Sequence, residues 1–216
     1  MSQKKKKKIK KTHHQGVMGR SDIPFAERLA LKQHSDIAIN REHSAKITMF
    51  CMSVAIHELE GIGYKRIVEF SRHFKECIDE MYKDVEVGMV HAKRRLAQFG
   101  IEISGELYVA PLEGLTLKEQ EVRDNALQAS QIANICGIIA LHNVFKFGKE
   151  KLDRISVRVQ ELSTRYKKEG EKFLLEEMEK IGFQIINGSV IAYTEEDGTP
   201  ISVSAAKKQG IYTPVF

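Results

Sequence analysis

Two segments of the chain carry the same pattern of apolar and polar positions. In each, apolar residues recur at steps of three and four, which is the spacing of an amphipathic helix with one buried face. The first set is Ile67, Phe70, Phe74, Cys77 and Met81. Moved along the chain by 85 positions, the set becomes Leu152, Ile155, Val159, Leu162 and Tyr166. The pattern predicts two equivalent long helices.

The residues around these two helices also correspond. With the same shift, five residues are identical in the two copies: Ile47, Cys51, Ala55, His57 and Gly63 align with Ile132, Cys136, Ala140, His142 and Gly148. When the alignment allows a gap of three residues in the second copy, the matches continue: Leu96, Phe99, Gly100, Ile101 and Ile103 align with Met178, Ile181, Gly182, Phe183 and Ile185. A chance likeness between two helical hairpins is the alternative. We expect an internal duplication of a three-helix unit, with a glycine ending the third helix and a strand after it.

Local signals place the ends of further helices. The segment 21–24, Ser-Asp-Ile-Pro, predicts the start of a short helix, and Asp36 is the expected cap of the long helix after it. Thr116 and Glu119 are spaced as a capping box, which predicts the start of the second unit's first helix.

Near the C-terminus the pattern changes to the alternation typical of strands. Segments 189–194 and 200–204 flank a Glu-Glu-Asp-Gly turn, and Asn187-Gly188 is a second turn signal. The expected fold class is therefore mainly α with a small antiparallel β element (α+β). We place the parts of the chain as follows: a disordered lysine-rich arm at 1–20, a first helical unit at 21–110, a second at 111–186, and a C-terminal β-hairpin and tail at 187–216.

Composition and charge narrow the class of protein. A chain of 216 residues that is 42% hydrophobic can bury a sizeable core, and no apolar stretch is long enough to cross a bilayer. Three cysteines without close spacing indicate reduced, buried thiols, so we expect a cytoplasmic protein with no membrane partner. The net charge of +5 is not spread evenly over the chain. Residues 1–21 contain eight cations and no acids, so residues 22–216 carry a net charge of −3. Seven of these cations are the lysines of the arm: Lys4, Lys5, Lys6, Lys7, Lys8, Lys10 and Lys11.

Candidate chemistry centres on the turns between the paired helices. The segment 59–67, Leu-Glu-Gly-Ile-Gly-Tyr-Lys-Arg-Ile, resembles the helix-hairpin-helix motif, whose Gly-hydrophobic-Gly turn points backbone N–H groups at a nucleic-acid phosphate. That family usually has a proline before the first glycine, whereas here Glu60 brings a charge that opposes a phosphate. The second copy has Lys146 in place of the first glycine. The residues that the resemblance assigns to nucleic-acid binding are Gly61, Gly63, Lys65, Arg66, Lys146, Gly148, Lys149 and Lys151. The alternative is that these glycines only let two helices turn tightly.

A second resemblance concerns the whole layout. The block 140–148, Ala-Leu-His-Asn-Val-Phe-Lys-Phe-Gly, with its echo at 55–67, resembles small helical proteins of unknown function carried by phages and prophages of Gram-positive bacteria. That group brings no established activity, so it assigns no functional residue.

The leading hypothesis is a non-enzymatic accessory protein, phage-encoded as the second resemblance implies, that binds nucleic-acid phosphates through the two turns and the arm. The rival is a helical regulatory protein that binds an acidic or other protein partner, or forms a homodimer through its C-terminal sheet. A Mg²⁺-dependent nucleotide hydrolase is a remote third, built on helical carboxylates: Glu76, Asp79, Glu80, Glu176, Glu177 and Glu179. We expect no cofactor and no metal, because Cys51 and His57 would lie on different faces of one helix. No catalytic residue is assigned, since the chain carries none of the common nucleophile or phosphate-loop motifs.

Overall fold

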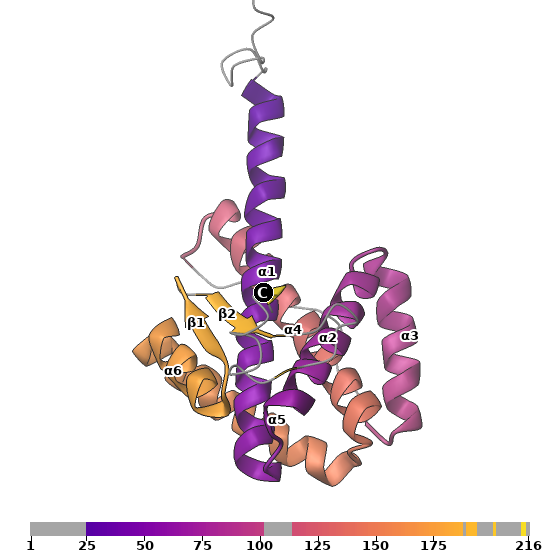
Figure 1. The fold of residues 1–216 in the computed structure, drawn as a ribbon. Helices are drawn as coiled ribbons and strands as arrows, with labels where there is room; N and C mark the ends of the chain where they lie inside the picture. The colour runs from indigo at the N-terminus through magenta and orange to yellow at the C-terminus, as the bar shows by residue number, and fades with distance from the viewer. Residues whose placement is uncertain (1–24, 102–113, 188, 194–200, 202–212, 215–216) are drawn as a thin grey trace, which may run out of the picture. The chain divides into compact units, whose positions relative to one another are not determined.

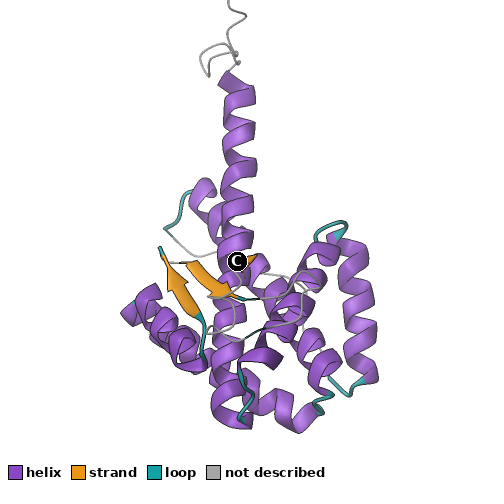
Figure 2. Ribbon diagram, viewed as in Figure 1, coloured by secondary structure: helices purple, strands orange, loops and turns teal. Residues whose placement is uncertain are grey.

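The structure is a computed structural model that describes residues 25–101, 114–187, 189–193, 201 and 213–214, with side chains from residue 36 onward. The chain divides into two compact units, 1–36 and 37–216. Six helices and three short strands follow one another in the described residues (Figure 1; Figure 2): α1 Phe25–Glu60, α2 Tyr64–Met81, α3 Val85–Gln98, α4 Leu117–Phe145, α5 Lys149–Glu169, α6 Glu171–Ile181, β1 Gln184–Ile186, β2 Ser189–Ala192 and β3 Thr213–Pro214.

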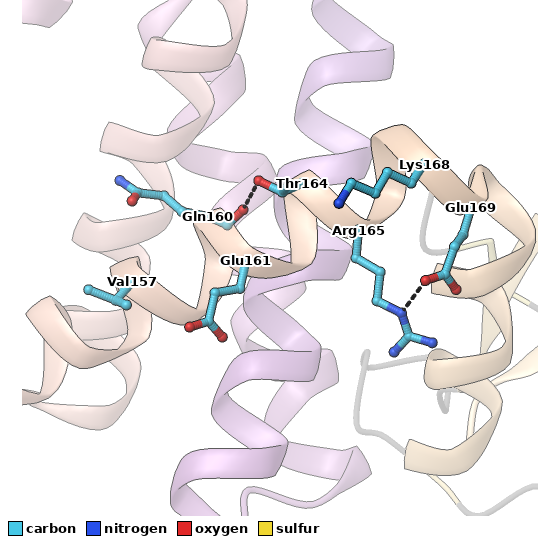
Figure 3. Close-up of a pocket in the computed structure, with 7 residues that line it drawn as sticks. All are labelled: Val157, Gln160, Glu161, Thr164, Arg165, Lys168 and Glu169. Carbon is cyan, nitrogen blue, oxygen red and sulfur yellow. Dashed lines mark hydrogen bonds and ion pairs between the residues drawn. The ribbon is translucent and has the colours of Figure 1, made fainter.

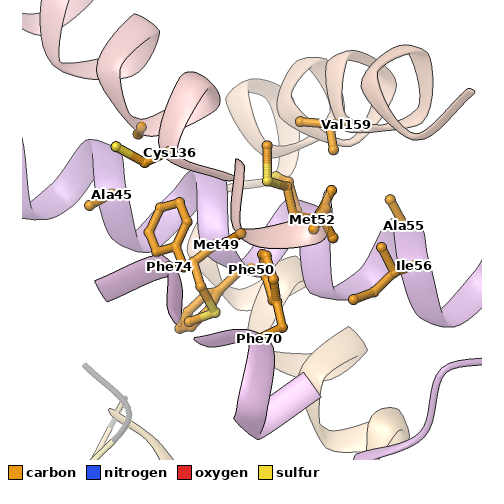
Figure 4. Close-up of a cluster of buried hydrophobic side chains, with 14 of the residues drawn as sticks. Ala45, Met49, Phe50, Met52, Ala55, Ile56, Phe70, Phe74, Cys136 and Val159 are labelled. Atoms are coloured by element: carbon orange, nitrogen blue, oxygen red, sulfur yellow. The ribbon is translucent and has the colours of Figure 1, made fainter. Parts of the chain in front are cut away.

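The first helices of the two predicted units form the centre of the core. Every residue of α1 from Ile47 to Ile56 is buried, and several of these side chains, among them Met49 and Phe50, lie in the apolar cluster drawn in Figure 4. In α4, Gly137 leaves room for the Met52 side chain, since a Cβ at that glycine would lie only 2.1 Å from the Met52 sulfur. Helices α1 to α6 all contribute to one buried cluster, and α2 packs along α4. The two predicted helical units therefore pack against each other around a shared core.

The ends of the helices repeat with the spacing found in the sequence. Helices α1 and α4 end 85 residues apart, and α2 and α5 begin 85 residues apart. The third helices end alike, because Gly100 and Gly182 both have positive φ, at 73° and 113°. After each glycine the chain folds back in the same way: the N–H of Ile101 donates to the Leu96 carbonyl at 3.0 Å, and Phe183 repeats this bond to Met178 at 3.1 Å. These correspondences support the duplication, which stays a prediction.

The β element is a small antiparallel sheet in the order β1–β2–β3. Strands β1 and β2 pair antiparallel, and the positive φ of Asn187, 51°, fits the tight turn expected after β1. Strand β1 begins at Gln184, just before the boundary placed at 187. The other expected hairpin, 189–204, lies mostly outside the described residues, although Ile201 donates its N–H to the Tyr193 carbonyl at 2.9 Å. The fold class, mainly helical with a small antiparallel sheet, is confirmed.

Two local predictions have opposite outcomes. The capping box at the start of α4 is confirmed: the Glu119 N–H donates to the Thr116 hydroxyl at 3.3 Å, and the Thr116 N–H donates to the Glu119 carboxylate at 2.8 Å. The expected cap at Asp36 is wrong, because α1 runs without a break from Phe25 to Glu60. A residue such as Asp, which favours helix starts, is also tolerated within a helix when the neighbouring residues hold the helix together.

Candidate phosphate-binding turns

The two predicted turns have the same backbone conformation. In the first, Gly61 is left-handed at φ 64°, and Gly63 caps α2 with φ −86° and ψ 170°. In the second, Lys146 takes the left-handed position at φ 57°, and Gly148 caps α5 with φ −82° and ψ 175°. The replacement of the first glycine by lysine in the second copy therefore leaves the shape of the turn unchanged.

A histidine braces each turn from the helix that precedes it. The Nδ1 atoms of His57 and His142 lie 2.9 Å from the carbonyl oxygens of Ile62 and Phe147, the middle residues of the turns. A carbonyl can only accept, so each ring donates from Nδ1. Phe147 is buried and Ile62 packs against the core, so the apolar residue of each turn points inward while the flanking glycines are exposed. This explains why the histidines recur at the same place in both copies.

The backbone N–H groups at the start of α2 and α5 are open. Neither helix has a side-chain cap at its N-terminus. Within the described residues, the N–H groups of Gly63, Tyr64 and Lys65 have no acceptor, nor do those of Gly148 and Lys149. Such groups, together with the positive end of the helix dipole, are the usual means by which a helix start holds an anion. Both turns thus offer the chemistry that the resemblance assigned to them.

Cross-contacts bring the two turns together. Arg66, one turn into α2, donates to the carbonyl of Val144 near the end of α4 at 2.9 Å and lies over the Phe145 ring. Lys151, at the repeat-equivalent position in α5, forms an ion pair with Glu60 at the end of α1. Each second helix therefore contacts the end of the other copy's first helix. Because these contacts are made by residues next to the turns, both turns lie at the same end of the helical core.

Glu60, whose charge opposed the phosphate hypothesis in the sequence, is neutralised in the structure. Its carboxylate binds Lys151 and also Arg154, whose Nη2 lies 2.7 Å from Oε1. The Glu60 side chain is only 9% exposed, so little of its charge reaches solvent. Arg154 was missed in the sequence, because its equivalent in the first copy is Glu69 and the repeat therefore gave no signal for it.

The cations of the candidate set fall into two groups. Lys65 and Lys146 are exposed and have no ion-pair partner in the described part of the chain. The others pair with acids: Arg66 with Glu69 at 3.1 Å, Lys149 with Asp153 at 2.5 Å, and Lys151 with Glu60. Exposed ion pairs contribute about 0–1 kcal/mol, so the pairs of Arg66 and Lys149 yield readily to a phosphate. The seven arm lysines lie outside the described residues.

Carboxylates of the hydrolase hypothesis are scattered and paired on their own helices. Asp79 pairs with Lys75 at 3.1 Å, and Glu177 pairs with Lys180 at 2.7 Å. Across the described residues, no group of three or more His, Cys, Asp or Glu side chains could hold a metal ion. The arrangement is that of solvated helix faces.

Cysteines in the core are unsuited to nucleophilic chemistry. All three are free, and Cys51 and Cys136 are buried, as the sequence predicted, whereas Cys77 is only half-buried. Burial raises the pKa of Cys51 to about 11 and that of Cys136 to about 12, so both thiols stay protonated at neutral pH.

A hollow on the outer face of α5 is shown in Figure 3. Its volume is about 490 Å³. The Thr164 hydroxyl donates to the Gln160 carbonyl at 2.9 Å, and Arg165 pairs with Glu169 at 2.6 Å (Figure 3). Because cations and acids alternate along this face, it offers no net charge that would select a ligand.

Comparisons with family models, with curated proteins and with solved structures find no match to the chain. None of the helices that the structure describes is long and apolar enough to span a lipid bilayer.

Proposed function

We propose that this chain is a non-enzymatic nucleic-acid-binding accessory protein whose two turns grip the phosphate backbone without reading base sequence. The observation that carries the proposal is the pairing of the turns. Two helix starts with open N–H groups lie at one end of the core, and Glu60, the acid that precedes the first turn, is bound by Lys151 and Arg154.

The free cations support the same assignment. Lys65 follows the first turn, Lys146 lies within the second, and both are exposed. Lysine side chains neutralise phosphates and release counterions, so the affinity falls as salt rises. The lysine arm adds the same kind of attraction, which is independent of sequence.

One observation favours the rival, a helical protein that binds another protein. Residues 22–216 carry a net charge of −3, whereas a dedicated nucleic-acid surface usually leaves its domain basic. The two hypotheses differ in where the binding energy lies. Phosphate binding by the turns depends on Lys146, while arm-driven attraction to any acidic partner does not.

The test measures the affinity of the full chain for a DNA duplex over a range of salt concentrations. We expect Lys146→Gln to reduce the slope of log affinity against log salt by about 1, the value for one lost phosphate contact. Lys75→Gln is the matched control, because Lys75 is exposed on α2 and pairs with Asp79 away from the turns. Deletion of residues 2–20 should weaken binding without abolishing it. If Lys146→Gln and Lys75→Gln give the same slope as the parent, the turns do not bind phosphate.

A further inference from the structure

A groove of about 740 Å³ opens between α1, α4 and α5. Ile47 and Met52 of α1, Ile138 of α4 and Val159 of α5 supply its apolar surface, and Val159 is drawn beside Met52 in Figure 4. Hydroxyl and amide groups surround these apolar residues, among them Thr48 and Asn134. This combination of apolar walls and a few polar groups, in this range of volume, is typical of small-molecule sites.

Four residues of the groove differ in kind from their counterparts in the first copy. The 85-residue shift places α1 on α4, α4 on α1, and α5 on α2. Four groove residues then have large, apolar counterparts: Asn134, Val159, Ser163 and Tyr166 correspond to Met49, Phe74, Ile78 and Met81, in that order. All four of these counterparts are buried. The second copy thus has small or polar side chains where the first has core residues.

The difference between the copies indicates the size of the occupant. Valine stands where the first copy has phenylalanine, and serine stands where it has isoleucine, so the space gained at these two positions is that of side chains and not that of a helix. Interiors are normally packed to the density of organic crystals, so a groove of this size leaves room for an occupant. A small molecule fits this volume better than an element of a partner protein.

Charge points to the kind of small molecule. None of the described residues that line the groove is acidic, whereas His43 and Lys167 supply basic nitrogens. These two lie at one end, because the Tyr166 hydroxyl is 3.1 Å from the His43 Nε2 atom and Lys167 is the next residue of α5. Glu171, the first residue of α6, forms an ion pair with Lys46 at 2.5 Å. An anionic group is therefore favoured at the His43 end.

We propose that the α1–α4–α5 groove binds a small amphiphilic anion, with its apolar part against Met52 and Val159 and its negative group beside His43 and Lys167. This site is separate from the two turns and does not depend on the proposed nucleic-acid binding.

Two fluorescent naphthalenes that differ by one charge test the proposal on the full chain. The probes are 8-anilino-1-naphthalenesulfonate and its uncharged analogue N-phenyl-1-naphthylamine. We expect the sulfonate to bind about tenfold more tightly, the ratio that one charge-assisted hydrogen bond gives. Lys167→Gln should remove most of that preference and leave the affinity of the uncharged probe unchanged. Lys168→Gln is the matched control, since Lys168 is the next residue of α5 and lines the outer hollow instead.

A second variant fills the groove with the residue of the first copy. Ser163→Ile should weaken both probes, and the thermal unfolding midpoint shows whether the variant is folded. The proposal is overturned if neither naphthalene binds, as expected for a groove that accepts only a partner's helix. It is equally overturned if Lys167→Gln and Lys168→Gln have the same effect, or if folded Ser163→Ile binds both probes as the parent does.

Discussion

Substitution of Gly63 by aspartate should stabilise the protein while weakening its binding to nucleic acid. Gly63 caps α2 with an extended backbone, no side-chain cap is present, and an added Cβ meets nothing within 4 Å. An aspartate there accepts a hydrogen bond from the first turn of α2 and interacts well with the helix dipole. The loss of glycine also reduces the entropy of the unfolded chain, so the free energy of unfolding should rise by about 0.5–1 kcal/mol.

The same carboxylate opposes a phosphate at the turn. Two unit charges about 4 Å apart repel by about 1 kcal/mol in water and about 4 kcal/mol near a protein surface. The affinity for a DNA duplex should therefore fall by at least about fivefold. Gly63→Asn is the matched control, because asparagine caps the helix without adding a charge and should cost much less affinity.

Urea unfolding followed by circular dichroism gives the stability, and fluorescence anisotropy with a labelled duplex gives the affinity. A Gly63→Asp variant that is more stable and binds DNA as tightly as the parent would refute the phosphate assignment. A loss of stability in both variants would instead show that the cap geometry is wrong.

Three further predictions concern the core and its helix ends. Phe74→Ala should lower the free energy of unfolding by about 3–5 kcal/mol, because Phe74 is fully buried. Val159→Ala beside the groove should cost much less, and urea unfolding measures both variants. Thr116→Ala removes the capping box and should cost about 1 kcal/mol, detectable as faster amide exchange at the start of α4. The free energy of unfolding should fall as the pH rises from about 9.0 toward 11, because burial raises the Cys51 pKa to about 11 in the folded state and the unfolded thiol therefore loses its proton first. Cys51→Ala should flatten this decline when urea unfolding is repeated over the alkaline range.

Periodicity predicted the helices well, because their stability depends on a buried apolar stripe that is visible in the sequence. The stripe from Ile67 to Met81 lies within α2, and four of its five positions are buried. The helix stop at Gly182 was also predictable, since glycine adopts positive φ at low cost. Asp36 misled the prediction, because a residue that favours caps is only a local signal and the neighbouring residues continue the helix.

Contacts between the copies could not be predicted, because they depend on how the two units pack. The sequence shows Glu60 as an acid beside a turn, and only the fold brings Lys151 and Arg154 to it. The left-handed conformation of Lys146 was likewise hidden, since lysine rarely adopts it and the surrounding helices impose it. The groove became visible only when residues such as Ser163 could be compared with their counterparts in the folded core.

The most direct test of the central claim is an amide NMR titration of the full chain with a short DNA duplex. If the two turns grip phosphates together, the amide signals of Gly63 and Gly148 shift in parallel and saturate at the same duplex concentration. The claim that the turns bind phosphate is contradicted if DNA binds while the chemical shifts of both glycine amides stay unchanged.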